Sequence, residues 1–279
     1  MGMKNKDPLE KEWKAFLKRE EKTLKGYGNK KEPFLEKKLK TVVPDGLQEK
    51  LNTLFLKAFR VILQNGTGVI EKTYPKKKLM AEFKTREYAQ KVYATRKNLK
   101  AARKTAGGQT IKNVAGAGAE GAVLGLLGIG LPDIPLFLGV IFRSLYTLAL
   151  HYGIDYEEGE EQELLLDLLT LSLYRGKDFR DLDAAMNRRL FAAAGKDRKK
   201  RRGGEAADQN GGVQKACSRE SVRRASGALS EELLYMKFLQ GIPVAGVIGG
   251  IYDGIYLKKI TDYAAVKLER RYLLSKMEP

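Results

Sequence analysis

Apolar residues recur along the chain at the three- and four-residue spacing of a single helix face. The first such run opens at Asp7-Pro8, where an N-cap residue precedes a proline, and it stops at Gly26. A second run, extending to Gly66, follows the sequence DGLQ at 45–48, which has the form of a capping box. Nothing in the pattern indicates a strand-rich domain. We therefore predict an all-α, multi-helix fold.

Three more helices are predicted before the last quarter of the chain. A long basic helix is expected over 76–105, with Tyr88, Val92 and Tyr93 among its apolar positions. Helices are also expected over 157–174 and over 177–194, where Phe179, Leu182, Met186, Leu190 and Phe191 are the predicted packing residues.

The range 195–229 differs from its neighbours, with six glycines, ten basic residues and few large apolar ones. This composition predicts a disordered basic linker. Its KDRKKRR run is interpreted as a solvated charge run rather than a polyanion-binding tract. The linker divides the predicted organisation into a basic helical extension (1–44), the first part of a helical core (45–194), and C-terminal helices that complete the core (230–279).

Two glycine-rich apolar segments dominate the predicted core, GAGAEGAVLGLLGIGLPDIP at 116–135 and GIPVAGVIGG at 241–250, the second leading into a long C-terminal helix. The first contains a G-x-G-x-x-G match. A dinucleotide-binding loop would follow a β-strand and have an acidic residue about twenty positions further on. The preceding sequence is basic and helical, and no such acid follows. We therefore assign no cofactor-binding residues.

Four-residue spacing explains these glycines better. It places small residues on one helix face, which allows another backbone to approach closely. That face meets either a crossing helix within a packed core or else lipid or a partner's helix, and both alternatives stay open. The predicted small-residue positions are Ala117, Gly121, Gly125, Gly246, Gly250 and Gly254.

Prolines and isolated charges interrupt the same segments. Pro132, Asp133 and Pro135 predict a break between two helices, and Pro243 predicts another. No uncharged run reaches the roughly 20 residues that cross a bilayer, although a re-entrant hairpin remains an alternative. Arg143 and Asp253, the isolated ions of the two segments, are predicted to pair because either would be costly to bury alone.

Charge is concentrated at one end of the sequence. The formal net charge is +18, and residues 1–112 hold 29 Lys and Arg against 12 Asp and Glu, a net of +17. Such a field attracts polyanions, either an anionic membrane or nucleic acid. The predicted anion-binding face comprises Lys84, Arg86, Lys91, Arg96, Lys97, Lys100, Arg103 and Lys104.

Residues with catalytic potential are few. Cys217 and His151 are the only cysteine and histidine. Together they give no convincing transition-metal site, and one cysteine excludes a disulfide framework within the chain. His151 closes an apolar segment and is interpreted as a helix-end histidine with its polar atoms satisfied. No catalytic residues are assigned.

The LPDIP break, the Tyr152-Gly153-Ile154-Asp155 ending and the terminal helix from GIPVAGVIGG to ERRYL together resemble the EcsC family. The family is named for a protein encoded beside an ABC transporter involved in exoprotein secretion. The resemblance implies a helical, intracellular bacterial protein at the membrane or near a transporter. It brings no catalytic residues.

These observations favour a non-enzymatic accessory or interaction protein in the cytoplasm, attached to the inner face of the cell membrane through basic residues. A membrane-protein partner, such as an ABC transporter, is a second expected contact. One alternative is a nucleic-acid-binding protein that uses residues 76–112, with Tyr88 and Tyr93 stacking on bases. A third is an enzyme of unrecognised type, such as a lipid hydrolase.

Overall fold

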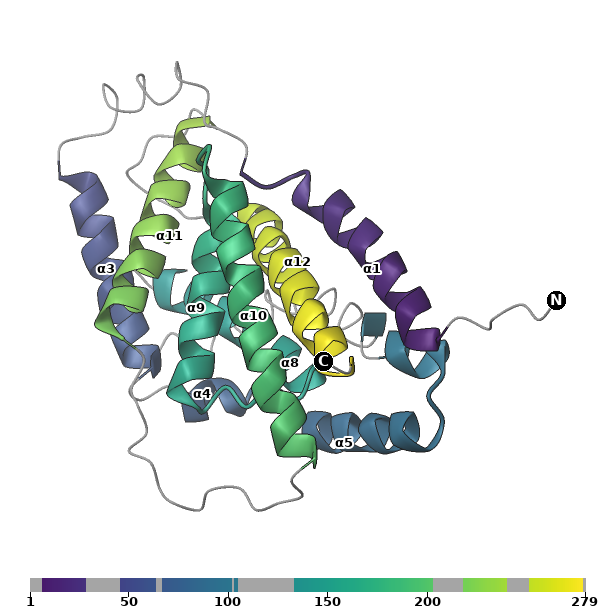
Figure 1. Ribbon diagram of the computed structural model, residues 1–279. Coiled ribbons are helices and arrows are strands. Elements are labelled where there is room, and N and C mark those ends of the chain that lie inside the picture. The colour runs from purple at the N-terminus through teal and green to yellow at the C-terminus, as the bar shows by residue number, and fades with distance from the viewer. Residues whose placement is uncertain are drawn as a thin grey trace.

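A computed structural model describes residues 7–28, 46–63, 67–101, 103–104, 133–202, 218–239 and 251–277 (Figure 1). Every regular element among them is helical, which confirms the predicted all-α fold. The helices are α1 (Pro8–Leu24), α3 (Leu47–Val61), α4 (Thr67–Glu71), α5 (Lys76–Val92), α8 (Asp133–His151), α9 (Gly159–Leu173), α10 (Phe179–Arg202), α11 (Arg219–Leu239) and α12 (Ile251–Leu274).

Helix α12 lies at the centre of the bundle and packs against α1, α8, α9 and α10. Helix α11 joins α9 to α3, while α8 contacts α3, α4 and α5 on its other sides. In Figure 1, α1 runs along the outer side of α12, and α5 crosses one end of the bundle. The basic N-terminal region is thus spread over several outer helices.

The hydrophobic core is built largely from α8 and from the leucine-rich 164–173 part of α9. Leu138, Ile141 and Leu145 of α8 are fully buried, as are Leu166 and Leu168 of α9. A helix that is apolar on most of its circumference must be surrounded by other helices. The neighbours of α8 and α9 supply that cover.

The start of α1 is fixed by the predicted capping residue, and its end is held by Tyr27, which the sequence pattern did not identify. The Asp7 carboxylate accepts a hydrogen bond from the Leu9 backbone N–H at 3.0 Å, and the proline occupies the first turn. Beyond the helix, Tyr27 stacks on Phe179 with ring centroids 6.3 Å apart and donates to the Lys259 carbonyl at 2.7 Å. These contacts hold the end of α1 against α10 and α12.

Gly153 ends α8 in a left-handed conformation, with φ of +75°. Its N–H donates to the Leu150 carbonyl at 3.1 Å, and the Ile154 N–H donates to the Ala149 carbonyl at 2.9 Å. This is the Schellman pattern, which favours glycine. A β-carbon here would also overlap the ring of Phe83 in α5. The YGID ending therefore lets α5 pack closely against the end of α8.

The predicted helix over 76–105 is wrong, because the chain turns at 93–95. Tyr93 is extended, with φ of −131° and ψ of 93°. The Thr95 hydroxyl accepts a hydrogen bond from the Asn98 backbone N–H at 3.3 Å, and the Asn98 side chain donates to the Tyr93 carbonyl at 2.9 Å. A second helical segment follows this turn, and its residues 96–101 and 103–104 are described; we call it the 96–104 segment. The turn allows Arg96 and Arg103 to reach α1.

Helices extend into the predicted linker from both sides. Helix α10 continues to Arg202 and α11 begins at Arg219, so residues 195–202 and 219–229 are helical rather than disordered. The reason is that neighbouring helices bind charged side chains of both segments, Asp197 by Arg271 of α12 and Arg224 by Asp167 of α9. Residues 203–217, including Cys217, lie outside the described part.

Two local predictions also differ from the structure. The cap of α3 is Gly46, which has φ of +76° and no capping side-chain hydrogen bond. Asp45, the expected capping residue, lies outside the described residues. On α10, Leu182 and Phe191 are exposed, because α9 and α12 cover the side that carries Met186 and Leu190.

We predict that Gly153→Ala lowers the free energy of unfolding by about 2–4 kcal/mol, because alanine must adopt positive φ and displace Phe83. Gly227→Ala is the matched control, since nothing lies within 4 Å of its added β-carbon inside α11. That variant should be more stable by about 0.5–1 kcal/mol. Urea unfolding of both variants checks the prediction. Similar free energies for the two variants would contradict it.

Candidate functional site

Four charged residues lie close together on the central helix α12: Lys267, Glu269, Arg270 and Arg271. Positions so close in sequence point in different directions around a helix. Helix α1 pairs with Lys267, Glu269 and Arg270, while α9 and α10 supply counter-charges to Arg271, and α10 also to Lys267. We call this arrangement the α12 charge cluster.

Lys267 is fully buried at the junction of α1, α10 and α12. Its ammonium nitrogen lies 3.0 Å from Glu20 Oε1 and 2.7 Å from Asp183 Oδ1, and it donates to Asn187 Oδ1 at 2.9 Å. These contacts use the three hydrogen-bond donors of an ammonium group. Arg270 also binds Glu20. Two cations and two carboxylates thus neutralise one another inside the bundle.

The protonation of Glu20 reflects this pairing. Burial alone raises its pKa, but the hydrogen bond from Arg270 and the charge of Lys267 outweigh burial. The pKa of Glu20 therefore lies below its ordinary value, and the carboxylate stays charged.

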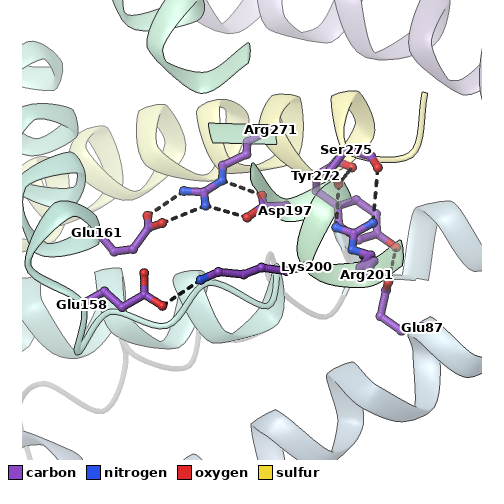
Figure 2. A network of polar contacts seen from close by, with 9 residues as sticks. All are labelled: Glu87, Glu158, Glu161, Asp197, Lys200, Arg201, Arg271, Tyr272 and Ser275. Atoms are coloured by element: carbon purple, nitrogen blue, oxygen red, sulfur yellow. Dashed lines mark hydrogen bonds and ion pairs between the residues drawn. The ribbon is translucent and has the colours of Figure 1, made fainter. Parts of the chain in front are cut away.

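Arg271 joins three helices through two carboxylates (Figure 2). Its guanidinium donates to both oxygens of Glu161 in α9, at 2.6 and 2.8 Å. It also donates to both oxygens of Asp197 in α10, at 2.8 and 2.9 Å. Burial would lower the pKa of Arg271, but these hydrogen bonds raise it above its ordinary value. Close to these Arg271 contacts, Lys200 donates to Glu158 at 2.9 Å.

Residues of the KDRKKRR run at 196–202 bind the C-terminal part of the chain and so help to hold α10 against α12. Arg198 donates to the Met277 carbonyl at 2.7 Å. Figure 2 shows Arg201, which donates to the Ser275 hydroxyl at 2.6 Å. Cations suit this position because the last carbonyls of a helix carry partial negative charge. The interpretation of the run as solvated charge is therefore wrong for Asp197, Arg198 and Arg201.

The predicted basic face separates into two groups. Arg86 donates to the His151 carbonyl at 2.8 Å, while Arg96 and Arg103 bind Glu12 at 2.8 and 3.5 Å. These three arginines hold helices together. The lysines remain at the surface, with Lys84, Lys91, Lys97 and Lys104 exposed and Lys100 half-buried.

Four apolar residues are exposed near these lysines. Tyr88 and Tyr93 are each 71% exposed, Val92 is 50% exposed, and Met80 is 39% exposed. The sequence pattern gave Tyr88, Val92 and Tyr93 as apolar positions of the helix together with Leu79 and Phe83. In α5 the structure packs the side with Leu79 and Phe83. Both sides have helical spacing, so the pattern alone could not show which one is covered.

The described residues contain neither a helix long and apolar enough to cross a bilayer nor a group of three His, Cys, Asp or Glu positioned to hold a metal ion. A family model for the EcsC protein family matches residues 10–273. The chain belongs to the EcsC protein family. Searches of curated proteins and of solved structures gave no match.

The residues matched by the family model, 10–273, include the motifs on which the resemblance was based. In this EcsC-family chain, YGID is the end of α8, and the ERR of ERRYL belongs to the α12 charge cluster. Both motifs position helices. The family match alone assigns no activity to them.

Several predicted positions fall outside the described residues. These include all but one of the small-residue positions, together with two of the prolines: Ala117, Gly121, Gly125, Gly246, Gly250, Pro132 and Pro243. Gly254 lies within α12, but its surroundings are not described. Asp133 begins α8, and Pro135 is buried in its first turn. The Arg143–Asp253 pair stays a prediction because the Asp253 side chain is not described.

His151 ends α8, as expected, but its ring is not satisfied. The side chain is fully buried, and neither ring nitrogen has a hydrogen-bond partner within the described part of the chain. Burial, assisted by the charge of Arg86, lowers its pKa from 6.5 to about 4. The folded protein therefore keeps His151 neutral in weak acid.

This pKa predicts acid sensitivity. As pH falls below 6.5, the unfolded chain protonates His151 before the folded chain does. The free energy of unfolding should therefore drop by about 3 kcal/mol between pH 6.5 and about pH 4. His151→Gln should lack this part of the loss. Urea unfolding across that pH range measures the difference, and parallel pH profiles for the two proteins would contradict the prediction.

Proposed function

We propose that this EcsC-family protein is a non-enzymatic accessory protein that docks on an anionic membrane surface through the outer side of α5. We call this side the α5 face, and it comprises Lys77, Met80, Lys84, Tyr88, Lys91 and Val92. All six side chains are exposed. Their spacing of three and four residues places them on one side of the helix.

The opposite side of α5 packs against the rest of the bundle. Leu79 is buried, Phe83 packs on the core, and Arg86 donates to the end of α8. Figure 1 shows α5 at the periphery, crossing one end of the molecule. One side of α5 is therefore held by the bundle, while the lysines and large apolar side chains of the other side are exposed. This combination of exposed lysines and apolar side chains on one fixed helix is the observation that supports the proposal.

The chemistry of the α5 face suits a membrane interface. Lysines near an anionic leaflet contribute about 1 kcal/mol each, and the attraction is screened by salt. Tyrosines favour the level of the lipid headgroups, where the ring is partly apolar and the hydroxyl stays wet. A surface helix that combines the two binds the interface without crossing it. A membrane-protein partner, such as an ABC transporter, would be met at the same surface.

Nucleic acid is the second candidate, favoured by the exposed rings of Tyr88 and Tyr93 beside lysines. Met80 and Val92 argue for lipid, because aliphatic side chains gain little beside a phosphate backbone. Vesicle flotation and a gel shift with DNA and RNA, performed on the same protein, separate these two candidates.

We predict that the protein floats with vesicles containing phosphatidylglycerol, and that neutral phosphatidylcholine or high salt abolishes flotation. Lys84→Gln/Lys91→Gln should weaken binding roughly 30-fold, since each lysine contributes about 1 kcal/mol. Lys18→Gln/Lys22→Gln is the control, because it removes two exposed charges from α1 instead. Part of the vesicle binding should persist at intermediate salt, and Tyr88→Ser should weaken that part.

Equal losses in the two double variants would show that net charge, rather than the α5 face, drives binding. Binding to neutral vesicles at high salt would refute the electrostatic part of the proposal. A gel shift without flotation would replace it with the nucleic-acid function.

A further inference from the structure

Four arginines surround the junction of α1, the 96–104 segment, α8 and α12. We call Arg19, Arg86, Arg96 and Arg103 the arginine cluster. The first lies on α1, the second on α5, and the other two follow the turn at 93–95. The charges of Arg86 and Arg103 both act on the buried Tyr152 phenol just beyond α8. The cluster thus extends from the surface to Tyr152.

Glu12 occupies the outer part of this cluster. Its carboxylate is bound by Arg96 at 2.8 Å, Arg19 at 3.0 Å and Arg103 at 3.5 Å, and the side chain is only 1% exposed. Three guanidinium groups around one carboxylate are more donors than two oxygens require. The three arginine side chains are themselves 33–43% exposed. An oxyanion in solution can therefore reach them.

Two arginines of the cluster and Tyr152 carry buried hydrogen-bonding atoms that have no partner among the described residues. Arg19 Nε, Arg86 Nε and the Tyr152 hydroxyl have no hydrogen-bond partner within the described residues. Tyr152 is only 4% exposed. A buried donor that makes no hydrogen bond is costly, and an acceptor placed beside it removes that cost. These groups therefore point to a ligand rich in acceptor oxygens.

The local charge also favours an anion. Arg19 is shared with Glu269, which it binds at 2.7 Å. Arg103 also lies 4.0 Å from Glu269. In these ion pairs three arginines, Arg19, Arg96 and Arg103, face two carboxylates, Glu12 and Glu269. An excess of one positive charge remains among them.

We propose that the arginine cluster binds a phosphate group, and that Glu12 is an internal carboxylate competing for the same guanidinium donors. A phosphate presents more acceptor oxygens than a carboxylate and a larger negative charge, and guanidinium groups bind it in a bidentate manner. A free phosphomonoester and a lipid headgroup share this chemistry. The site involves α1 and the 96–104 segment rather than the α5 face, so it does not depend on the proposed membrane docking.

The test is calorimetric titration of the full chain with inorganic phosphate and with pyrophosphate. The wild-type protein should bind at least one of them saturably. Arg103→Gln should weaken binding by roughly ten-fold or more, because it removes one guanidinium partner. Glu12→Gln should tighten binding by roughly ten-fold by removing the competitor. Glu10→Gln, an equal charge change at an exposed position of the same helix, should have little effect.

A second experiment identifies the source of the phosphate. Vesicles containing phosphatidic acid display a phosphomonoester, whereas phosphatidylglycerol displays only a diester. Binding that depends on Arg103 for phosphatidic acid alone identifies a headgroup, and binding of the free anions identifies a soluble ligand. Lys84→Gln/Lys91→Gln should leave the titration with free phosphate unchanged, so failure of membrane docking and failure of this site are distinguishable.

The proposal is overturned if the wild-type protein binds neither free phosphate, pyrophosphate nor phosphatidic acid in an Arg103-dependent manner. It is also overturned if Glu10→Gln and Glu12→Gln tighten binding equally, since general charge would then explain both. Circular dichroism verifies that each variant is folded. If Glu12→Gln does not fold, Arg96→Gln and Arg103→Gln provide the test. Both variants should bind phosphate more weakly than the wild-type protein, and unchanged binding would overturn the proposal.

Discussion

The fold depends on one constraint, which is that the charges buried along α12 must all be paired. Ionised groups removed from water are costly unless a counter-charge and hydrogen bonds replace the lost hydration. Lys267, Arg270 and Arg271 are all largely buried, so α1, α9 and α10 have to bring carboxylates to them. These ion pairs constrain the register of α1, α9 and α10 against α12. Apolar packing alone would tolerate rotations that these pairs forbid.

The same constraint divides the basic residues of the protein into two populations. Arginines at interior junctions, such as Arg271 and Arg198, hold helices to one another. Lysines such as Lys84 and Lys91 stay at the surface, where they are available to a partner. The guanidinium suits the interior role because it is planar and can serve two acceptors at once, whereas the ammonium is more strongly hydrated. Lys267 is a buried exception, and three side chains accept its hydrogen bonds. The net charge of +18 therefore overstates what the surface offers to an anion.

Much of the helical framework could be predicted from the sequence, because its signals are local. Asp7-Pro8 marks the start of α1, and Gly153 marks the end of α8. The turn at 93–95 was missed because the segment beyond it is held by Glu12, more than eighty residues earlier. The helix beyond residue 194 was missed because its charged composition resembles that of a solvated run. Only its distant partners, such as Arg271 for Asp197, reveal its role.

The candidate surfaces show the same limit. Sequence identified a basic stretch but could not separate Arg86, Arg96 and Arg103 from the lysines around them, because their acceptors belong to α1 and the end of α8. It could not show that Tyr88 faces solvent, since either side of α5 could have been buried. The sequence also gives no sign that Arg19 Nε, Arg86 Nε and the Tyr152 hydroxyl make no hydrogen bond within the described part of the chain.

The most direct test of the central claim compares two lysines of α12. Lys267 is buried among Glu20 and Asp183, whereas Lys258 is 68% exposed and pairs with Asp262 one turn away. If buried pairing holds the bundle together, Lys267→Met should lower the free energy of unfolding by about 3–5 kcal/mol, and Lys258→Met should change it by less than about 1 kcal/mol. Similar small losses for both variants would show that the charges on α12 are incidental to the fold.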